Sequence, residues 1–342
     1  MQGFITCFGL SDNTVFKSMK RISVVVTAYN RKEFLPDSLN SLIAQTISKS
    51  DFEVVLLTNF DYDISPFGAL NINHIILEGT IGEYLYEAGE RAQGEIICFL
   101  DDDDIFDKNK LQTILKRFTE NVIYLKHPTY RFKEIGELES LNLLPNDKIK
   151  YITKEDYFHP NIYAYNKSSI SLRKSFFKKY SPFIKNIDTS EDWFLFLAFL
   201  SESGIGIYDY NFLSYYRVHQ SASKKAISRS DSTFSYYVRF LHRQIRAFQY
   251  MKELFKNSLA QTVLDYQISV FKFRLLLLSG EDKMKVEKVD LMNLFRASAH
   301  NYNEFWIVKT LFVRSFIVYY FPQLSSITER VYAKISKRLN AQ

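Results

Sequence analysis

Apolar residues in the first 126 positions gather in short runs that are separated by segments with helical spacing. The runs ISVVVTA, FEVVLLT, NHIIL and EIICFL are rich in β-branched and large aliphatic residues, which is typical of buried strands in a parallel sheet. We predict strands over 22–28, 52–58, 73–77, 95–100 and 121–126, and helices near 33–46, 80–92 and 108–119. This alternation predicts an α/β fold with a mostly parallel, doubly wound sheet whose strand ends share one edge.

The second part of the chain changes character twice. Residues 127–165 carry three prolines and mixed charge, and they predict a long irregular segment. Beyond it the pattern predicts a strand over 168–172, helices over 173–180 and 191–202, one or two strands within 206–218, and long helices near 232–256, 258–279, 287–299, 303–320 and 325–339. We therefore expect an α/β region over 1–223 and a helical region over 224–342.

Composition favours a folded protein of the reducing cytosol. The chain has 342 residues, of which 46% are hydrophobic, so it can bury a sizeable core. Its two cysteines, Cys7 and Cys98, form no disulfide or zinc pattern. No signal-peptide pattern and no long uncharged apolar stretch is present, so we expect a cytoplasmic location without a spanning helix.

Charge divides the chain in the same place as the helical pattern. Residues 224–342 hold 20 Lys and Arg against 9 Asp and Glu, whereas the whole chain has a net charge of +6. The front region is therefore acidic and the helical region basic, which predicts different partners for the two.

Four consecutive acids, Asp101 to Asp104, end the apolar run EIICFL. Ligands of open α/β sheets collect at the carboxyl ends of strands. Four carboxylates placed there repel one another, and a divalent cation relieves that repulsion. Oxygen ligands suit Mg²⁺ or Mn²⁺, whose remaining positions are commonly filled by substrate phosphates. The alternative is a solvated acidic loop in front of the helix that begins near Asp107.

Three further segments carry polar groups that suit a site. Thr27, Ala28 and Tyr29 follow the first strand and can form a slot for a nucleobase, or an ordinary turn. Glu191 and Asp192 begin an apolar helix, where the helix dipole favours acids but aromatic neighbours can raise a carboxyl pKa into the range of a general base. His219, between Arg and Ser, is either a ligand for metal or phosphate or a structural histidine.

The order of these segments, VVVTAYNR, GEIICFLDDDD, SEDW and YYRVHQSAS, resembles the inverting family 2 glycosyltransferases of the GT-A fold. The resemblance covers about residues 20–223. It implies a nucleotide-sugar half over about 20–126 and an acceptor half over about 127–223, with a nucleotide-diphosphate sugar as the donor.

The resemblance also implies roles for the acids. Asp101, Asp102 and Asp103 match the DXD motif, in which Asp101 and Asp102 would contact the nucleotide and Asp103 would ligate Mn²⁺ or Mg²⁺ on the diphosphate. Asp104 matches a further acid of the motif. His219 matches a histidine that completes the metal site in some members.

Asp192 matches the catalytic base of the family, with Glu191 as the second candidate, and the loop Thr27–Tyr29 matches the nucleobase slot.

One position departs from the family pattern. The aspartate pair that reads the base after the second strand is replaced by a segment containing Asn59, whose amide can still donate to and accept from a base edge. The nucleotide is therefore left open.

The acceptor is expected to be a glycan or a lipid-linked molecule, facing residues 127–165 and 166–169. The apolar stretch 305–321 contains Lys309 and Arg314 and is followed by more basic residues, which indicates contact with an anionic membrane surface. Its alternative is a core helix or a homodimer interface.

Sequence motifs distinguish the expected glycosyltransferase from other classes of protein. A non-catalytic nucleotide-sugar-binding module of the same fold remains the alternative. A nucleotidyltransferase needs a Gly-rich basic loop near the first strand, and a dehydrogenase needs GxGxxG after a strand. The sequence contains neither, and it has no nucleic-acid reading motif.

Overall fold

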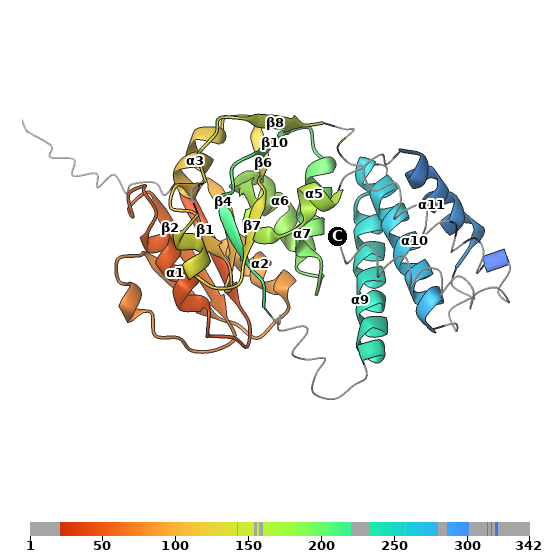
Figure 1. Cartoon of the computed structure of the whole chain (residues 1–342), viewed down its shortest axis with the longest axis horizontal. Helices are drawn as coiled ribbons and strands as arrows, with labels where there is room; N and C mark the ends of the chain where they lie inside the picture. Colours follow the sequence, from red (N-terminus) through yellow and green to blue (C-terminus); the bar gives the residue numbers. More distant parts are fainter. Residues whose placement is uncertain are drawn as a thin grey trace, which may run out of the picture.

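The computed structural model describes residues 21–141, 143–153, 156, 160–219, 233–256, 258–279 and 286–300, together with Val313, Phe316, Tyr319 and Tyr320. Within these residues an α/β part is followed by a group of long helices (Figure 1). This arrangement confirms the predicted fold class. The expected division at residue 223 falls outside the described residues and stays a prediction.

The main sheet has eight strands in the order β3-β2-β1-β4-β9-β6-β10-β8. Its strands are β1 Ile22–Ala28, β2 Phe52–Thr58, β3 Ile72–Ile76, β4 Ile96–Asp101, β6 Val122–Lys126, β8 Ile149–Ile152, β9 Ile170–Arg173 and β10 Ile205–Asp209. Six of these run in one direction, as predicted, whereas β9 and β8 run antiparallel to their neighbours. The direction of β9 matters because its amino end lies at the edge where the parallel strands end.

Helices cover both faces of the sheet. On one face lie α1 Leu35–Ile43 and α3 Lys110–Arg117, and on the other lie α2 Ile81–Arg91, α6 Lys174–Ile184 and α7 Glu191–Leu200. Alternation along β1 explains the two layers, because Val24 and Val26 pack on the first face and Val25 on the second. Every residue of β1 and β2 is buried, as the unbroken apolar runs predicted.

The prediction of an irregular segment over 127–165 is wrong. This segment contains β7 Thr129–Phe132, α4 Gly136–Glu139, β8 and α5 Pro160–Ala164. The elements are short and none repeats a pattern for long enough to be recognised from sequence. Strand β7 joins β5 Ile105–Phe106 and β11 Ser214–Arg217 in a second, three-stranded sheet beside the acid loop.

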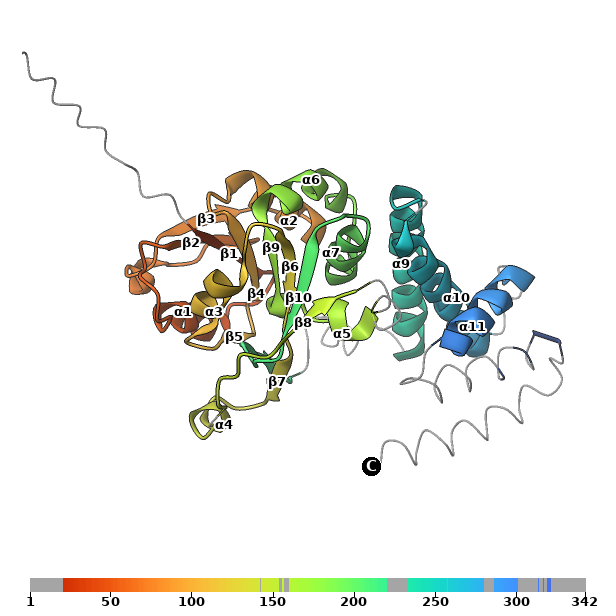
Figure 2. The ribbon, with the colours of Figure 1, turned by 90° about the horizontal axis from the view of Figure 1, so that it is seen from above.

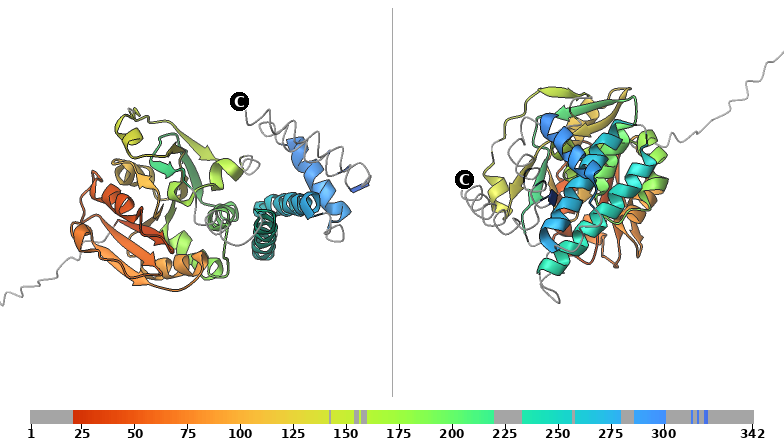
Figure 3. Two further views of the ribbon diagram at one scale, coloured as in Figure 1. Left: turned by 60° about the horizontal axis from the view of Figure 1, so that its bottom comes forward. Right: turned by 90° about the vertical axis from the view of Figure 1, so that its right-hand side faces the viewer.

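The long helices α9 Thr233–Leu254, α10 Leu259–Ser279 and α11 Lys288–His300 stand on the side of α7 (Figures 2 and 3). Buried residues of α9 and α10, including Phe248 and Leu264, belong to the same hydrophobic cluster as α7 and the strands. Among the helices described, none has the length and continuous apolar character that a bilayer crossing needs. Most of the apolar stretch 305–321 lies outside the described residues, as does the helix expected over 325–339.

Candidate active site

The predicted loops meet at the carboxyl edge of the main sheet. Thr27 of β1 is paired with Asp101 of β4, and Ala28 is paired with Thr58 of β2. The three strand ends therefore carry the nucleobase loop, the acid loop and Asn59 at one edge, as expected for parallel strands.

The acid loop, Asp101 to Asp104, is held in place by a serine of α1. The Ser38 hydroxyl is completely buried and lies within hydrogen-bond distance of the carbonyl oxygens of Asp102, at 2.8 Å, and Asp104, at 2.7 Å. The side chain of Arg217 donates to the carbonyl oxygen of Asp103 at 3.1 Å. These contacts fix the backbone, so the four carboxylates point in set directions.

The four acids have different surroundings. Asp104 is buried and accepts hydrogen bonds from the backbone N–H of Arg217 and the side-chain amide of Asn166. Burial, together with the charges of Asp103 and Asp101, raises its pKa well above the usual range. Burial also raises the pKa of Asp102 to about 6, although Arg31 opposes the shift. Asp104 therefore shapes the loop, whereas Asp101 and Asp103 are the more accessible acids.

The second sheet brings His219 to the acids. Because β11 runs antiparallel to β5, with Tyr215 opposite Ile105, the chain beyond β11 returns along the acid loop. His219 Nε2 lies 2.7 Å from Asp103 Oδ2. The two predicted metal ligands, 116 positions apart in sequence, are thus neighbours.

These two donors are suited to a divalent cation. A carboxylate oxygen and an imidazole nitrogen that converge on one point can hold a metal whose other positions go to water and substrate phosphates. Over the described ranges, no group of three or more His, Cys, Asp and Glu side chains is arranged to hold a metal. Two protein donors alone would leave the remaining positions of a metal to other ligands.

Lys167 connects the predicted motifs. Its side chain is 2% exposed, and Nζ lies 2.7 Å from Asp101 Oδ1, 2.9 Å from Thr27 Oγ1 and 3.8 Å from Glu191 Oε1. Burial works to lower its pKa, but the carboxylates of Asp101 and Glu191 outweigh burial and raise it. Lys167 is therefore a buried cation placed between the nucleobase loop, the acid loop and the start of α7.

Asp192 lies at the start of α7 with both carboxylate oxygens engaged by backbone donors. Oδ1 accepts from its neighbour Trp193 N at 2.8 Å, and Oδ2 accepts from Asn166 N at 3.2 Å. Burial, and next the charge of Glu191, raises the pKa of Asp192 to about 7. Burial raises the pKa of Glu191 too. A carboxylate with a pKa near neutrality is poised for general-base chemistry.

Helix α9 supports this base motif. Ser190, just before α7, has a left-handed backbone with φ 63°. Its hydroxyl donates to Gln244 Oε1 of α9 at 2.5 Å, and Gln244 Nε2 donates to Thr189 at 3.1 Å. Arg243 of α9 donates to the side chain and carbonyl oxygen of Asp188. The helical region thus holds the loop that leads into the proposed base.

The nucleobase loop is more open. Tyr29 is 50% exposed, and its ring lies against Tyr84 with centroids 6.4 Å apart. Asn59 and Asn30 form an amide pair: Asn59 Oδ1 accepts from Asn30 N at 2.8 Å and Asn59 Nδ2 donates to Asn30 Oδ1 at 2.7 Å. Asn59 therefore braces the loop in this conformation, and its role in reading a base stays a prediction.

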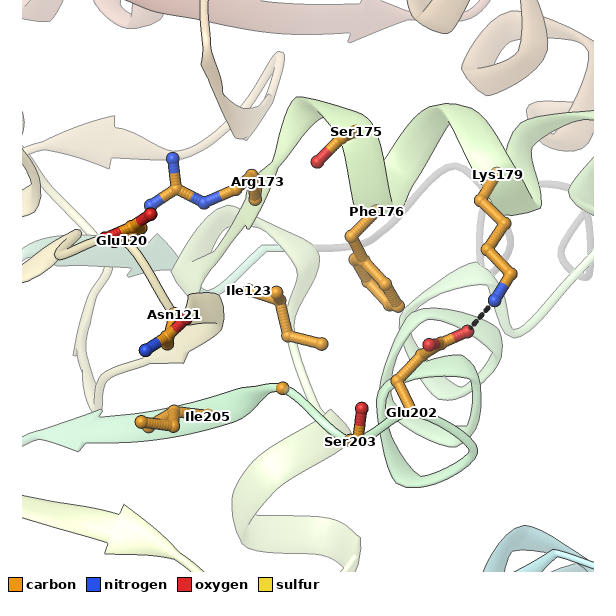
Figure 4. A pocket seen from close by; sticks show the side chains of 11 residues that line it. Glu120, Asn121, Ile123, Arg173, Ser175, Phe176, Lys179, Glu202, Ser203 and Ile205 are labelled. Atoms are coloured by element: carbon orange, nitrogen blue, oxygen red, sulfur yellow. Dashed lines mark hydrogen bonds and ion pairs between the residues drawn. The ribbon is translucent and has the colours of Figure 1, made fainter.

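A cavity of about 640 Å³ lies at the opposite edge of the sheet, where β6 and β10 begin and β9 ends (Figure 4). Its lining includes Arg173 and the ion pair of Lys179 with Glu202. None of the predicted site residues lines it. The predicted site residues gather instead at the carboxyl edge.

Sequence reasoning missed the contacts of three residues. It placed 166–169 near the acceptor, but Lys167 also reaches Asp101, and Asn166 connects Asp192 with Asp104. It gave no role to Arg31, whose guanidinium contacts Asp102 and Asp103. A lysine within a run of small polar residues and an arginine in a turn carry no periodic signal, so only the fold shows their partners.

Comparison with known proteins agrees with this geometry. Residues 23–181 match the family model described as glycosyl transferase family 2. The α/β part of the chain is therefore assigned to glycosyl transferase family 2. That match covers β1 through most of α6, and therefore includes the nucleobase loop, the acid loop and Lys167.

Curated relatives share parts of the length of this chain. The poly(ribitol-phosphate) β-N-acetylglucosaminyltransferase TarS of Staphylococcus aureus is 32% identical over 103 residues, 28% of this chain and 18% of TarS. The UDP-Glc:α-D-GlcNAc-diphosphoundecaprenol β-1,3-glucosyltransferase WfgD of Escherichia coli is 24% identical over 221 residues, 59% of this chain and 78% of WfgD. The chain spans only 16% to 36% of the length of five curated relatives with 30% identity or more.

Solved structures share the fold. The structure of TarS residues 1–349 with UDP-GlcNAc has a TM-score of 0.57 at 16% identity and covers 92% of each chain. The mannosyltransferase PcManGT of Pyrobaculum calidifontis, in complex with GDP-Man and Mn²⁺, has a TM-score of 0.50 at 13% identity, with 93% of this chain and 87% of that chain covered. At such identities the likeness supports the fold alone.

Proposed function

We propose that this protein is a glycosyltransferase that moves a sugar from a nucleotide-diphosphate sugar to a hydroxyl or phosphate acceptor. The configuration at the anomeric carbon is inverted in the transfer. The acceptor belongs to a glycan or a lipid-linked molecule. The observation that carries the proposal is Lys167, which lies within 2.7 Å of Asp101 and 3.8 Å of Glu191. The donor acids and the base motif are therefore only one side chain apart, which is close enough for one sugar ring to touch both.

The reaction is a single displacement. The acceptor oxygen attacks the anomeric carbon, the bond from that carbon to the diphosphate oxygen breaks, and its electron pair leaves with the nucleoside diphosphate. Asp192 takes the proton of an acceptor hydroxyl, because its raised pKa makes it a competent base near neutrality. General-base help of this kind is worth ~10²–10⁴-fold.

Other residues of the site bind and orient the nucleotide sugar. Thr27, Ala28 and Tyr29 hold the nucleobase, and Asn59 braces that loop. Asp101 and Asp102 contact the nucleotide in this proposal, with Lys167 fixing the direction of Asp101. Charged groups held in place before the reaction lower its barrier, since they need no reorganisation.

Asp103 and His219 would hold Mn²⁺ or Mg²⁺. The Mn²⁺ named with GDP-Man in the PcManGT structure supports a divalent metal for this fold. Such a metal, when bound, offsets the charge that grows on the departing diphosphate.

The acceptor proposal draws on the relatives' names. TarS acts on poly(ribitol-phosphate) and WfgD on a diphosphoundecaprenol-linked sugar. Together with the basic helical region they support an acceptor in glycoconjugate synthesis and a peripheral position on the cytoplasmic face of a membrane. Flotation with anionic liposomes at low salt tests that position, and failure to float argues against it.

The function is tested with a panel of nucleotide sugars and Mn²⁺ or Mg²⁺, scored by thermal shift and by release of nucleoside diphosphate. We expect one donor to stabilise the protein and to be consumed, and Asp103→Asn to lose both responses. Asp147→Asn is the matched control, because Asp147 is an exposed acid paired with Lys116. Binding without release for any acceptor would favour the non-catalytic module, and no response to any nucleotide would refute the proposal.

A further inference from the structure

Arg31 places a positive charge among the predicted metal ligands. It belongs to the turn after β1, and its guanidinium binds Asp102 with two hydrogen bonds of 2.6 Å each. Its Nη2 also lies 2.6 Å from Asp103 Oδ2, and Nη1 lies 3.2 Å from His219 Nε2. The ring of Phe34 lies 5.7 Å from the guanidinium carbon.

One oxygen atom is shared by Arg31 and His219. Asp103 Oδ2 is 2.6 Å from the Arg31 guanidinium and 2.7 Å from the His219 nitrogen. Divalent cations of this kind bind their ligands at about 2.0–2.2 Å. A metal on Asp103 and His219 would therefore lie against the guanidinium, where two positive charges repel strongly because the groups are partly shielded from water.

We propose that Arg31 is a built-in counter-ion that occupies the metal site and must leave Asp103 before a divalent metal binds. The inference rests on the proposed function, because it takes Asp103 and His219 as the metal ligands. Arg31 neutralises the acid loop without metal, and the cost of displacing it weakens metal binding by the free protein. Metal binding is thereby favoured when a diphosphate arrives to contribute further ligands.

A purely structural role of Arg31 predicts the opposite change. If the guanidinium only held Asp103 and His219 in a geometry that suits a metal, its removal would loosen the site and weaken metal binding. If Arg31 competes, removal strengthens metal binding. The sign of the change in affinity therefore distinguishes the two.

The test measures Mn²⁺ binding to the full chain without nucleotide, by titration calorimetry and by the electron paramagnetic resonance signal of free Mn²⁺. We expect Arg31→Gln to bind Mn²⁺ about tenfold tighter or more, since charge-assisted hydrogen bonds are lost from the competing state. Arg31→Lys, which keeps the charge but not the planar fork, is expected to fall between Arg31→Gln and the wild type. Arg31→Lys also keeps the inference testable if Arg31→Gln fails to fold.

Two controls accompany these variants. Arg117→Gln removes another largely buried arginine, one that pairs with Asp209 at 2.7 Å, and should leave Mn²⁺ affinity unchanged. Asp103→Asn in either background should abolish tight binding and so identify the site. Equal or weaker Mn²⁺ binding by both Arg31 variants overturns the inference, as does the absence of binding in every variant. Nucleoside diphosphate release, measured separately, reports on the proposed function alone.

Discussion

The pKa of Asp192 makes the identity of the base testable. Burial and the neighbouring charge of Glu191 raise this pKa to about 7, so the carboxyl group loses its proton in the neutral range and not near pH 4. We expect the rate of transfer to rise about tenfold between about pH 6 and pH 8 and then to level off. The assay is release of nucleoside diphosphate at subsaturating acceptor, since kcat/KM reports the pKa of the base in the free enzyme.

Two isosteric variants identify the residue whose ionisation causes the pH dependence of the transfer rate. Asp192→Asn should lower kcat by ~10²–10⁴-fold and remove the rise with pH. Donor affinity should be kept, because the hydrogen bonds of Asp192 go to the backbone of Trp193 and Asn166 and not to the nucleotide-binding residues. Glu191→Gln should keep most of the rate and shift the midpoint to lower pH, because the Glu191 carboxylate is one cause of the raised pKa. The reverse result, an inactive Glu191→Gln with an active Asp192→Asn, would make Glu191 the base and refute our assignment.

Stability measurements separate loss of the base from loss of the fold. A carboxyl whose pKa is raised by folding contributes stability that is fully present below its unfolded pKa of about 3.9 and is lost as the pH rises through about 7. At pH 8 the ionised Asp192 therefore opposes folding. Asp192→Asn loses one backbone hydrogen bond at every pH but also removes the charge that opposes folding at high pH. We therefore expect the variant to lose less stability relative to the wild type at pH 8 than at pH 5, and an equal loss at both pH values would contradict the assigned pKa shift.

Three further variants test the supports of the site. Lys167→Met leaves the partly exposed carboxylate of Asp101 without its cation and should cost about 1–3 kcal/mol in the free energy of unfolding, measured with denaturant, together with a loss of donor affinity. Gln244→Ala removes the contact to Ser190 and should lower kcat more than donor affinity; equal losses in both would contradict a role confined to the base motif. Gly94→Ala would place a Cβ 2.4 Å from the backbone of the neighbouring β1 strand and should lower the melting temperature by several degrees or prevent folding; an unchanged melting temperature would show that the strand can yield.

Most secondary structure of the α/β part was predictable because each element carries a strong periodic signal. The strands predicted over 22–28 and 52–58 coincide with β1 and β2, and the apolar helix predicted over 191–202 is α7 at 191–200. The direction of β9 was not predictable, because a buried strand of four residues has the same pattern whichever way it runs. Only its pairing with β4 and β6 determines that direction.

The candidate site was predictable to the extent that its groups follow strands. Asp101 and Thr27 end adjacent parallel strands, so the topology alone places them together. His219 reaches Asp103 through a two-residue strand, β5, which is too short to recognise from sequence. Lys167 reaches Asp101 because β9 runs against β4 and brings its amino end to the acid loop, with Cys98 opposite Ser171.

The charges of the site fall into a fixed part and an exchangeable part. The acids at 101–104, Glu191 and Asp192 crowd one edge, and two cations from other segments stand among them. Lys167 is 2% exposed and is held by partners on β1, β4 and α7, so no small ligand can replace it without unfolding its surroundings. Arg31 is 14% exposed, extends from a turn, and binds the same oxygen as the predicted metal ligand His219. We therefore infer that Lys167 holds the geometry of the donor acids and the base, and that Arg31 is the charge which the incoming substrate and metal displace.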